Sequence, residues 1–280
     1  MTLVRKRLSV EGCTAAYYEA GTPGKMPLLL MHGLGPGATV ESAFAAVLPF
    51  LSAHFHVFAT NLIGFGNSGQ KPSPPYFDFA LWVRQARALM DVMPGGPLGV
   101  FGHSASGAIA LRLAAAEPRV AALITTGTAG TRFEVNPHLA RLWTYPGTRA
   151  ELRLAMRSLL YDADSVSDEL LDTRWRTLQS PGYRQYFEAM FSGDLQKLAD
   201  SWVLPDEELA RIGARCTLVH GRNDLPCPAE ATSLRLAERI RHAHLVLLAN
   251  CGHAPSAEHP AEVCAAVRLA FARHVNFGQN

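Results

Sequence analysis

Six short apolar runs recur along the chain, and helix-like segments lie between them. The runs span residues 27–31, 56–60, 97–101, 120–125, 216–220 and 244–248. Continuous apolar runs of about five residues are typical of strands that are buried on both faces. Helical patterns occupy residues 79–92, 105–116, 229–239 and 260–274. Strands that alternate with helices predict an α/β fold, in which helices cover both faces of a parallel sheet.

Residues 131–205 interrupt this alternation. The stretch has no strand-like run, carries three of the four tryptophans (Trp143, Trp175 and Trp202) and contains several helical patterns. A chain of 280 residues is long enough for about two domains, but one α/β sheet with an insertion also fills this length. We therefore expect a core formed by residues 1–130 and 206–280, with residues 131–205 as a helical lid over one end of the sheet.

Charge and hydropathy exclude two classes of partner. Lys and Arg number 26 against 24 Asp and Glu, and the densest basic block is Arg5-Lys6-Arg7, so we expect no nucleic acid. No apolar run approaches the roughly 18 residues that span a bilayer, so we expect no membrane segment. The basic first ten residues are followed by Glu-Gly-Cys rather than by an apolar core, so we expect no secretory signal. Five scattered cysteines fit reduced thiols and a cytoplasmic location.

Residues 102–107 (Gly-His-Ser-Ala-Ser-Gly) join the third apolar run to a helical segment. A serine on a sharp turn between a strand and a helix exposes its hydroxyl at the carboxyl edge of the sheet. Ser104 is therefore the candidate nucleophile, and the Ala105 N–H at the helix start is a candidate oxyanion donor. The motif prefers glycine two residues after the serine, where this chain has Ser106. The competing interpretation is a serine-rich helix cap.

A serine nucleophile needs a base, and the base needs an acid that orients it. Asp224 follows the fifth apolar run and His253 follows the sixth, in the order serine, acid, histidine. Because ligands of such sheets gather at the carboxyl ends of the strands, we expect all three side chains to face one crevice. His220 and His259 remain alternative bases. An aspartate in a turn and a histidine in a loop are the competing interpretations.

The loop after the first apolar run, residues 31–37, is rich in glycine. Backbone of this kind can approach a substrate closely, which predicts contacts at Gly33 and Gly35. The Leu34 N–H is the candidate second oxyanion donor. No Gly-Lys-Ser/Thr ends the loop, which excludes a phosphate-binding P-loop. Residues 64–69 match G-x-G-x-x-G, but prolines follow where a helix is required, so we expect no dinucleotide. Two His-x-His pairs lack a nearby acidic or cysteine ligand, so we expect no metal.

The His32-Gly33 loop, the Ser104 turn, Asp224 and His253 together resemble the α/β-hydrolase fold over nearly the whole chain. Ser104 excludes the branches with an aspartate nucleophile, the haloalkane dehalogenases and epoxide hydrolases. Within the superfamily the chain is similar to the meta-cleavage product hydrolases, such as 2-hydroxymuconic semialdehyde hydrolase. Those enzymes cut a carbon–carbon bond in ring-fission products of aromatic degradation.

Four stretches carry this closer resemblance. They are residues 32–38, residues 62–68, the lid stretch from Tyr161 to Arg174, and the tail from Cys251 to His259. In the family the lid arginine binds the acid or dienol end of the substrate, and Arg174 falls on that position. The chain departs from the family pattern at four residues: Asn61 where Asp is common, His103 where Asn is usual, Ser106 where Gly is usual, and Ala254 where Trp is usual.

The resemblance implies eight mostly parallel strands, a helical lid and no metal or organic cofactor. It implies a serine hydrolase that cleaves a carbon–carbon bond in a 2-hydroxy-6-oxo-dienoate, with Ser104, His253 and Asp224 as nucleophile, base and orienting acid. Substrate contacts are expected at Gly33, Gly35, His103 and Arg174. The departures at His103 and Ala254 leave a carboxylesterase or lactonase as the alternative, and a slow-turnover ligand receptor as a further one. The expected partner is a small molecule, and a homo-oligomer is left open.

Overall fold

The computed structural model describes residues 3–278. Eight strands form one sheet in the order β1-β2-β4-β3-β5-β6-β7-β8. The first two pairings, β1 with β2 and β2 with β4, are antiparallel, and all the others are parallel. The strand bounds are β1 (Val4–Val10), β2 (Cys13–Gly21), β3 (Pro27–Met31), β4 (His56–Thr60), β5 (Leu98–His103), β6 (Val120–Thr126), β7 (Arg215–Gly221) and β8 (Ala243–Leu248).

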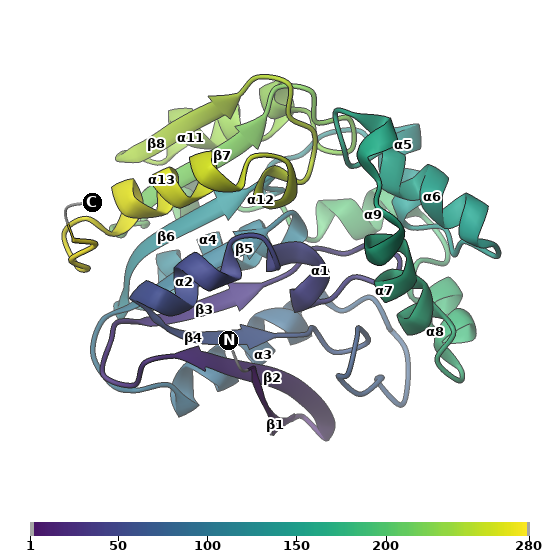
Figure 1. Ribbon diagram of the computed structural model, residues 1–280, viewed down its shortest axis with the longest axis horizontal. Coiled ribbons are helices and arrows are strands. Elements are labelled where there is room, and N and C mark those ends of the chain that lie inside the picture. Colours follow the sequence, from purple (N-terminus) through teal and green to yellow (C-terminus); the bar gives the residue numbers. More distant parts are fainter. Residues whose placement is uncertain (1–2, 279–280) are drawn as a thin grey trace.

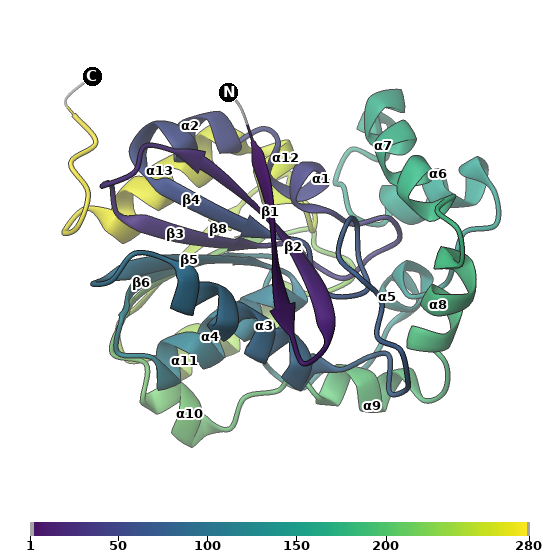
Figure 2. The ribbon, with the colours of Figure 1, turned by 90° about the horizontal axis from the view of Figure 1, so that it is seen from below.

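Helices cover both faces of this sheet (Figures 1 and 2). One face carries α1 (Val40–Phe44), α2 (Leu48–His54), α12 (Pro255–Glu258) and α13 (Pro260–Phe271). The other carries α3 (Phe79–Val92), α4 (Ala105–Ala116) and α11 (Ser233–Arg239), with α10 (Asp206–Ala210) and the 3₁₀ turn η2 (Ala229–Ala231) nearby. In β3 the side chains alternate between the faces: Leu29 and Met31 pack on one side, and Leu28 and Leu30 on the other. Because apolar layers cover both faces of β3, its sequence is a continuous apolar run.

Residues 131–205 contain helices and no strand. Their elements are α5 (Pro137–Leu142), α6 (Arg149–Arg157), the 3₁₀ turn η1 (Ala163–Ser165), α7 (Asp168–Leu178), α8 (Tyr183–Met190) and α9 (Leu195–Asp200). In both ribbon views these helices cluster at one end of the molecule (Figures 1 and 2). This end holds the loops that follow the parallel strands, because Arg174 of α7 contacts Gly37 after β3.

The fold expected from the sequence is confirmed, with differences in its elements. All six apolar runs lie in strands, except that Pro97 precedes β5. The N-terminal hairpin β1–β2 contains none of the six apolar runs. Most of Val4–Val10 is exposed at the edge of the sheet, and the largely buried β2 carries Thr14 and Glu19 among its apolar residues. The segment 229–239 is not one helix, since the turn η2 precedes α11. The last helix ends at Phe271 rather than at residue 274. Within residues 3–278, no helix has both the length and the apolar character needed to cross a membrane.

Candidate active site

Ser104 lies at the junction of β5 and α4 in a backbone conformation that only glycine adopts freely. Its φ is 58° and its ψ is −127°. Two glycines make this turn sterically possible. A Cβ on Gly102 would lie 2.2 Å from the Ser106 carbonyl oxygen, and one on Gly107 would lie 1.9 Å from Thr128 Oγ1. The turn therefore presents the Ser104 hydroxyl beyond the end of the strand, as the motif predicts.

Ser106 has a specific contact that explains how a serine fits at a position where glycine is usual. Its side chain is completely buried, and its hydroxyl donates a 2.5 Å hydrogen bond to the carbonyl oxygen of His32. This bond ties the first turn of α4 to the glycine-rich loop after β3. The two segments that carry the candidate oxyanion donors are therefore held together by this side chain.

His253 joins Ser104 and Asp224 in one hydrogen-bonded chain. His253 Nε2 lies 2.9 Å from Ser104 Oγ, and His253 Nδ1 lies 2.7 Å from Asp224 Oδ2. All three residues are buried. An ionised carboxylate only accepts hydrogen bonds, so Nδ1 carries the ring proton and Nε2 is free to accept the serine proton. This is the geometry by which a serine hydroxyl becomes a nucleophile.

Asp224 is held in its ionised form. Burial acts to raise the pKa of this carboxyl, but the neighbouring His253 and a hydrogen bond from His220 outweigh burial and hold the pKa well below its usual range. The backbone N–H of Cys227 donates to the other carboxylate oxygen at 2.8 Å. The carboxylate is thus charged and fully bonded on both oxygens, which fixes the orientation of the His253 ring.

His220 and His259, the alternative bases, contact other groups. His220 Nε2 lies 2.9 Å from Asp224 Oδ2 and 2.8 Å from the Cys227 carbonyl oxygen, so it contacts the carboxylate rather than Ser104. Its Nδ1 lies 2.5 Å from Ser233 Oγ. The His259 ring bonds to the Asn250 carbonyl oxygen. Only His253 has a ring nitrogen within hydrogen-bond distance of Ser104 among the described histidines.

The two candidate oxyanion donors lie on either side of Ser104. In residues 3–278, neither the Leu34 N–H nor the Ala105 N–H has a protein acceptor. Gly33 brings the Leu34 loop close, because a Cβ at Gly33 would lie only 2.7 Å from Ser104 Cβ. His32 holds the loop: its Nδ1 bonds to the Gly33 carbonyl oxygen at 2.7 Å and its Nε2 accepts from the Leu62 N–H. Burial lowers the pKa of His32 to about 4, so the ring is neutral at pH 7.

A small hollow lies next to Ser104. Its volume is about 20 Å³, which holds about one water molecule. Residues from the core and from residues 131–205 line it together: Gly33, Leu34, Gly35, Ala38, Ala43, His103, Ser104, Leu142, Leu159, Arg174 and His253. Every site residue expected from the sequence except Asp224 and Ala105 therefore faces this space.

Arg174 brings an unpaired positive charge to the hollow. The side chain is buried, Nη1 donates to the Pro36 carbonyl oxygen at 3.0 Å, and Nε has no partner among the described residues. Burial lowers the pKa of the guanidinium to about 10, which still leaves it charged at pH 7. A buried charge without a counterion is costly. Arg174 is therefore suited to bind an anionic group of a ligand.

His103 also faces the hollow and is neutral. Burial, and secondarily the charge of His253, lowers its pKa to about 3. Its Nδ1 lies 3.1 Å from both the carbonyl oxygen and the hydroxyl of Thr126. Because a carbonyl only accepts, Nδ1 carries the proton and Nε2 is an acceptor with no protein partner in residues 3–278. His103 can therefore accept a hydrogen bond from a ligand.

Sequence reasoning missed two residues that position the chain of hydrogen bonds. Gly127 follows β6 with a φ of 52°, and a Cβ there would lie 2.8 Å from the His253 carbonyl oxygen and 3.0 Å from its Nδ1. His220 is the second residue: the sequence suggests it only as an alternative base, and not as a partner of Asp224. The signal for Gly127 was available, because it follows a strand at the same edge as the other site residues. No group of three His, Cys, Asp or Glu residues in positions 3–278 is arranged to hold a metal ion.

Several known proteins are similar to this chain in sequence and in architecture. The model of the alpha/beta hydrolase family matches residues 28–267. The chain is 33% identical to a 2-hydroxy-6-oxo-2,4-heptadienoate hydrolase of Pseudomonas putida, over 81% of this chain and 82% of that protein. It is 32% identical to a 2-hydroxymuconate semialdehyde hydrolase of a Pseudomonas species, over 86% and 85%. A solved meta-cleavage product hydrolase of Pseudomonas fluorescens superposes with a TM-score of 0.89 at 28% identity, over 96% and 97%.

Proposed function

Because this chain belongs to the alpha/beta hydrolase family and, within it, to the meta-cleavage product hydrolases, we propose that it hydrolyses a carbon–carbon bond in a 2-hydroxy-6-oxo-dienoate. The observation that carries the proposal is the buried chain from Ser104 through His253 to Asp224, with the unpaired Arg174 facing the same hollow. Ser104 supplies a nucleophile, His253 supplies a base, and Arg174 supplies a site for the substrate carboxylate.

The proposed reaction begins with a proton transfer. His253 Nε2 moves a proton from the dienol hydroxyl to carbon 5, which gives a ketone that can stabilise the departing carbanion. Ser104 Oγ then adds to the carbon 6 carbonyl while His253 takes the serine proton. The N–H groups of Leu34 and Ala105 stabilise the oxygen that becomes negative. Cleavage of the bond between carbons 5 and 6 leaves its electron pair on the departing fragment as a dienolate, which takes the proton held by His253. Water, deprotonated by the now neutral His253, then releases the acyl group from Ser104 as a carboxylic acid.

In the proposed reaction, Arg174 and His103 orient the substrate. Arg174 binds the carboxylate through a charge-assisted hydrogen bond, bidentate if both outer nitrogens take part. The neutral His103 offers an acceptor nitrogen to the substrate in the same hollow. Gly33 and Gly35 allow the loop backbone to lie against the ligand. In this proposal residues 131–205 are the lid, since Leu142, Leu159 and Arg174 close the hollow from that side.

A direct assay tests the proposed function. We expect the wild-type enzyme to remove the visible absorbance of a synthetic ring-fission dienoate, and Ser104→Ala to lose at least about 10³-fold in kcat. Arg174→Gln should raise KM for the dienoate by about tenfold or more, because a buried ionic contact is lost. Arg174→Gln should change turnover of a neutral p-nitrophenyl ester far less. Turnover of the ester with no loss of dienoate absorbance contradicts carbon–carbon cleavage.

The alternative function is that of a carboxylesterase or lactonase. The observation that favours it is the pair of departures at His103 and Ala254, which flank the hydrogen-bonded chain in positions where the family usually has Asn and Trp. The same ester assay separates the two functions. A slow-turnover receptor would bind the dienoate and turn over neither compound.

We also propose a cytoplasmic location. The support is that all five cysteines are free thiols, four of them buried, as in proteins of a reducing compartment.

A further inference from the structure

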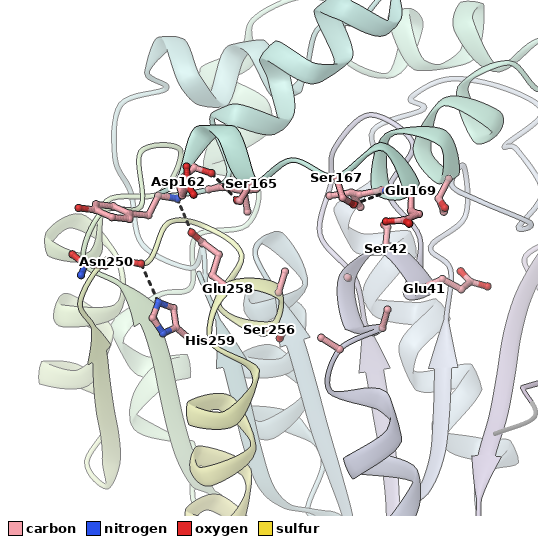
Figure 3. Close-up of a pocket in the computed structure, with 18 residues that line it drawn as sticks. Glu41, Ser42, Asp162, Ser165, Ser167, Glu169, Asn250, Ser256, Glu258 and His259 are labelled. Atoms are coloured by element: carbon pink, nitrogen blue, oxygen red, sulfur yellow. Dashed lines mark hydrogen bonds between the residues drawn. The ribbon is translucent and has the colours of Figure 1, made fainter.

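Glu258, at the end of α12, joins two distant parts of the chain. Its Oε1 accepts a 2.8 Å hydrogen bond from the Gly252 N–H, and its Oε2 accepts a 2.6 Å hydrogen bond from the Tyr161 N–H. Gly252 directly precedes His253, whereas Tyr161 belongs to residues 131–205. Figure 3 shows the side chain between the loop after β8 and the segment that carries Asp162. One carboxylate therefore holds backbone from both sides of the site.

A second set of contacts lies along the same boundary. The His253 N–H donates a 2.7 Å hydrogen bond to the Leu159 carbonyl oxygen. A Cβ at Gly252 would lie 2.6 Å from that oxygen and 2.9 Å from the Tyr161 nitrogen, so only glycine permits this approach. The backbone of residues 159–161 is thus packed directly on the loop that carries the proposed base. The position of His253 depends on this segment.

The same segment lines two cavities. Leu159 lines the hollow at Ser104, which has a volume of about 20 Å³, whereas Leu160 and Tyr161 line, with Glu258, a cavity of about 660 Å³ (Figure 3). Ala43 of α1 lines both cavities. The hollow is smaller than a dienoate of about ten heavy atoms, so its lining must rearrange when such a substrate binds. Leu159 is part of that lining, and a rearrangement that displaces residues 159–161 would break the bond between Tyr161 and Glu258.

We infer that Glu258 is a positioning residue that latches residues 159–161 to the His253 loop and so couples closure of the site to the placement of the base. The inference builds on the proposed function of this site. With both bonds made, the Gly252 N–H, the His253 N–H and the Leu159 carbonyl are all fixed. With the Tyr161 bond broken, the larger cavity opens toward Ser104 and substrate can enter past Ala43.

The carboxylate is required because it has two acceptor oxygens. A glutamine at position 258 has one acceptor oxygen and an NH₂ group, so one of the two backbone N–H groups would face another donor. Glu258→Gln therefore removes one of the two hydrogen bonds and, because the negative charge is lost, weakens the other, at nearly constant volume. Glu262→Gln is the matched control, because Glu262 lies four residues further along, in α13, and its one ionic neighbour among residues 3–278 is His259, at 3.8 Å.

The test combines hydrogen exchange with ester kinetics. We expect Glu258→Gln to speed amide exchange at Tyr161 and Gly252 by about tenfold or more, since a charge-assisted hydrogen bond is lost. We expect kcat for a p-nitrophenyl ester to fall by about tenfold with a smaller change in KM, because the base is misplaced while the binding surface remains. Glu258→Asp keeps the charge and should recover part of both losses. If Glu258→Gln does not fold, the same measurements are made on Glu258→Asp.

Two outcomes overturn the latch. One is that Glu258→Gln matches Glu262→Gln in exchange at Tyr161 and in kcat. The other is a loss of kcat with unchanged exchange at Tyr161. The readouts do not require the dienoate, so failure of the two proposals can be told apart. A wild-type enzyme that ignores the dienoate but shows these effects of Glu258→Gln on the ester refutes the carbon–carbon function and supports the latch.

Discussion

Gly33 lies where a methyl group would approach Ser104 Cβ to 2.7 Å and the His103 ring to 3.1 Å. The backbone conformation at Gly33 is not left-handed. Glycine is required there because a side chain has no room, and not because the backbone needs conformational freedom. Gly102 and Gly107 are required for the same reason on the other side of the turn. The site is therefore built by close backbone approach, which only the absence of a Cβ allows.

We predict that Gly33→Ala lowers kcat by at least about tenfold, because the loop that carries the Leu34 N–H must retreat from the oxyanion. The ester assay measures kcat, and thermal unfolding checks that the variant is folded. Gly213→Ala is the control, since nothing lies within 4 Å of a Cβ there and its φ is not positive. Equal kcat for the two variants contradicts a role for the loop in catalysis.

At the scale of elements, the loop after β3 and helix α7 support each other. A Cβ at Gly37 would lie 2.5 Å from the Arg174 carbonyl oxygen, and the Arg174 side chain in turn donates to the Pro36 carbonyl oxygen. Gly37 also has a φ of +64°, which a side chain would strain. The loop therefore fixes where α7 places its charge.

We predict that Gly37→Ala moves α7 and raises KM for the dienoate by about tenfold while changing KM for a neutral ester little. Gly24→Ala is the control because its φ of +92° imposes similar strain with nothing within 4 Å of the new Cβ. Steady-state kinetics on the two substrates measure the effect. A rise in KM for both substrates, or for both variants, contradicts the assignment of Arg174 to the carboxylate.

Across elements, the sequence predicted the six strands that contain a continuous apolar run, including β8, which is a partly exposed edge strand. It missed the exposed edge strand β1 and the largely buried β2, which carries Thr14 and Glu19 among its apolar residues. It also missed α1 and α2, which are too short to show a helical period, since they span five and seven residues. Element prediction thus followed the local pattern: strands with a continuous apolar run were found, whereas strands without one and very short helices were not.

The whole molecule should lose stability in mild acid because two histidines, the buried His32 and the half-buried His103, are neutral in the native state. Burial lowers the pKa of His32 to about 4 and of His103 to about 3, against an unfolded value of 6.5. Between pH 4 and pH 6.5 the unfolded chain binds more protons than the native protein, so the free energy of unfolding falls as the pH falls. Asp224 does not contribute in this window, since its pKa in both states lies below it.

We predict that the free energy of unfolding falls by up to about 1.4 kcal/mol per pH unit for His32 alone between pH 6.5 and 4.5. Urea unfolding at four pH values in this range measures the slope. His103→Asn, which cannot titrate, should show a shallower slope than the wild type. A free energy of unfolding that stays constant from pH 6.5 to 4.5 contradicts neutral burial of both rings.

From local pattern the sequence alone predicted the α/β fold and the candidates Ser104, Asp224 and His253, and the resemblance of its motifs indicated the hydrolase family. Strand periodicity is local, and the carboxyl ends of parallel strands must meet at one edge. The catalytic roles themselves stay predictions until the variants are assayed.

Only the tertiary structure decided which groups contact each other across that edge. It placed His220 behind Asp224 rather than beside Ser104, and the Glu258 carboxylate between Tyr161 and Gly252. These contacts join residues on separate elements, and they depend on the directions of side chains and on approaches of a few ångströms. Sequence spacing fixes which loops share an edge of the sheet, but packing fixes the distances on which the chemistry depends.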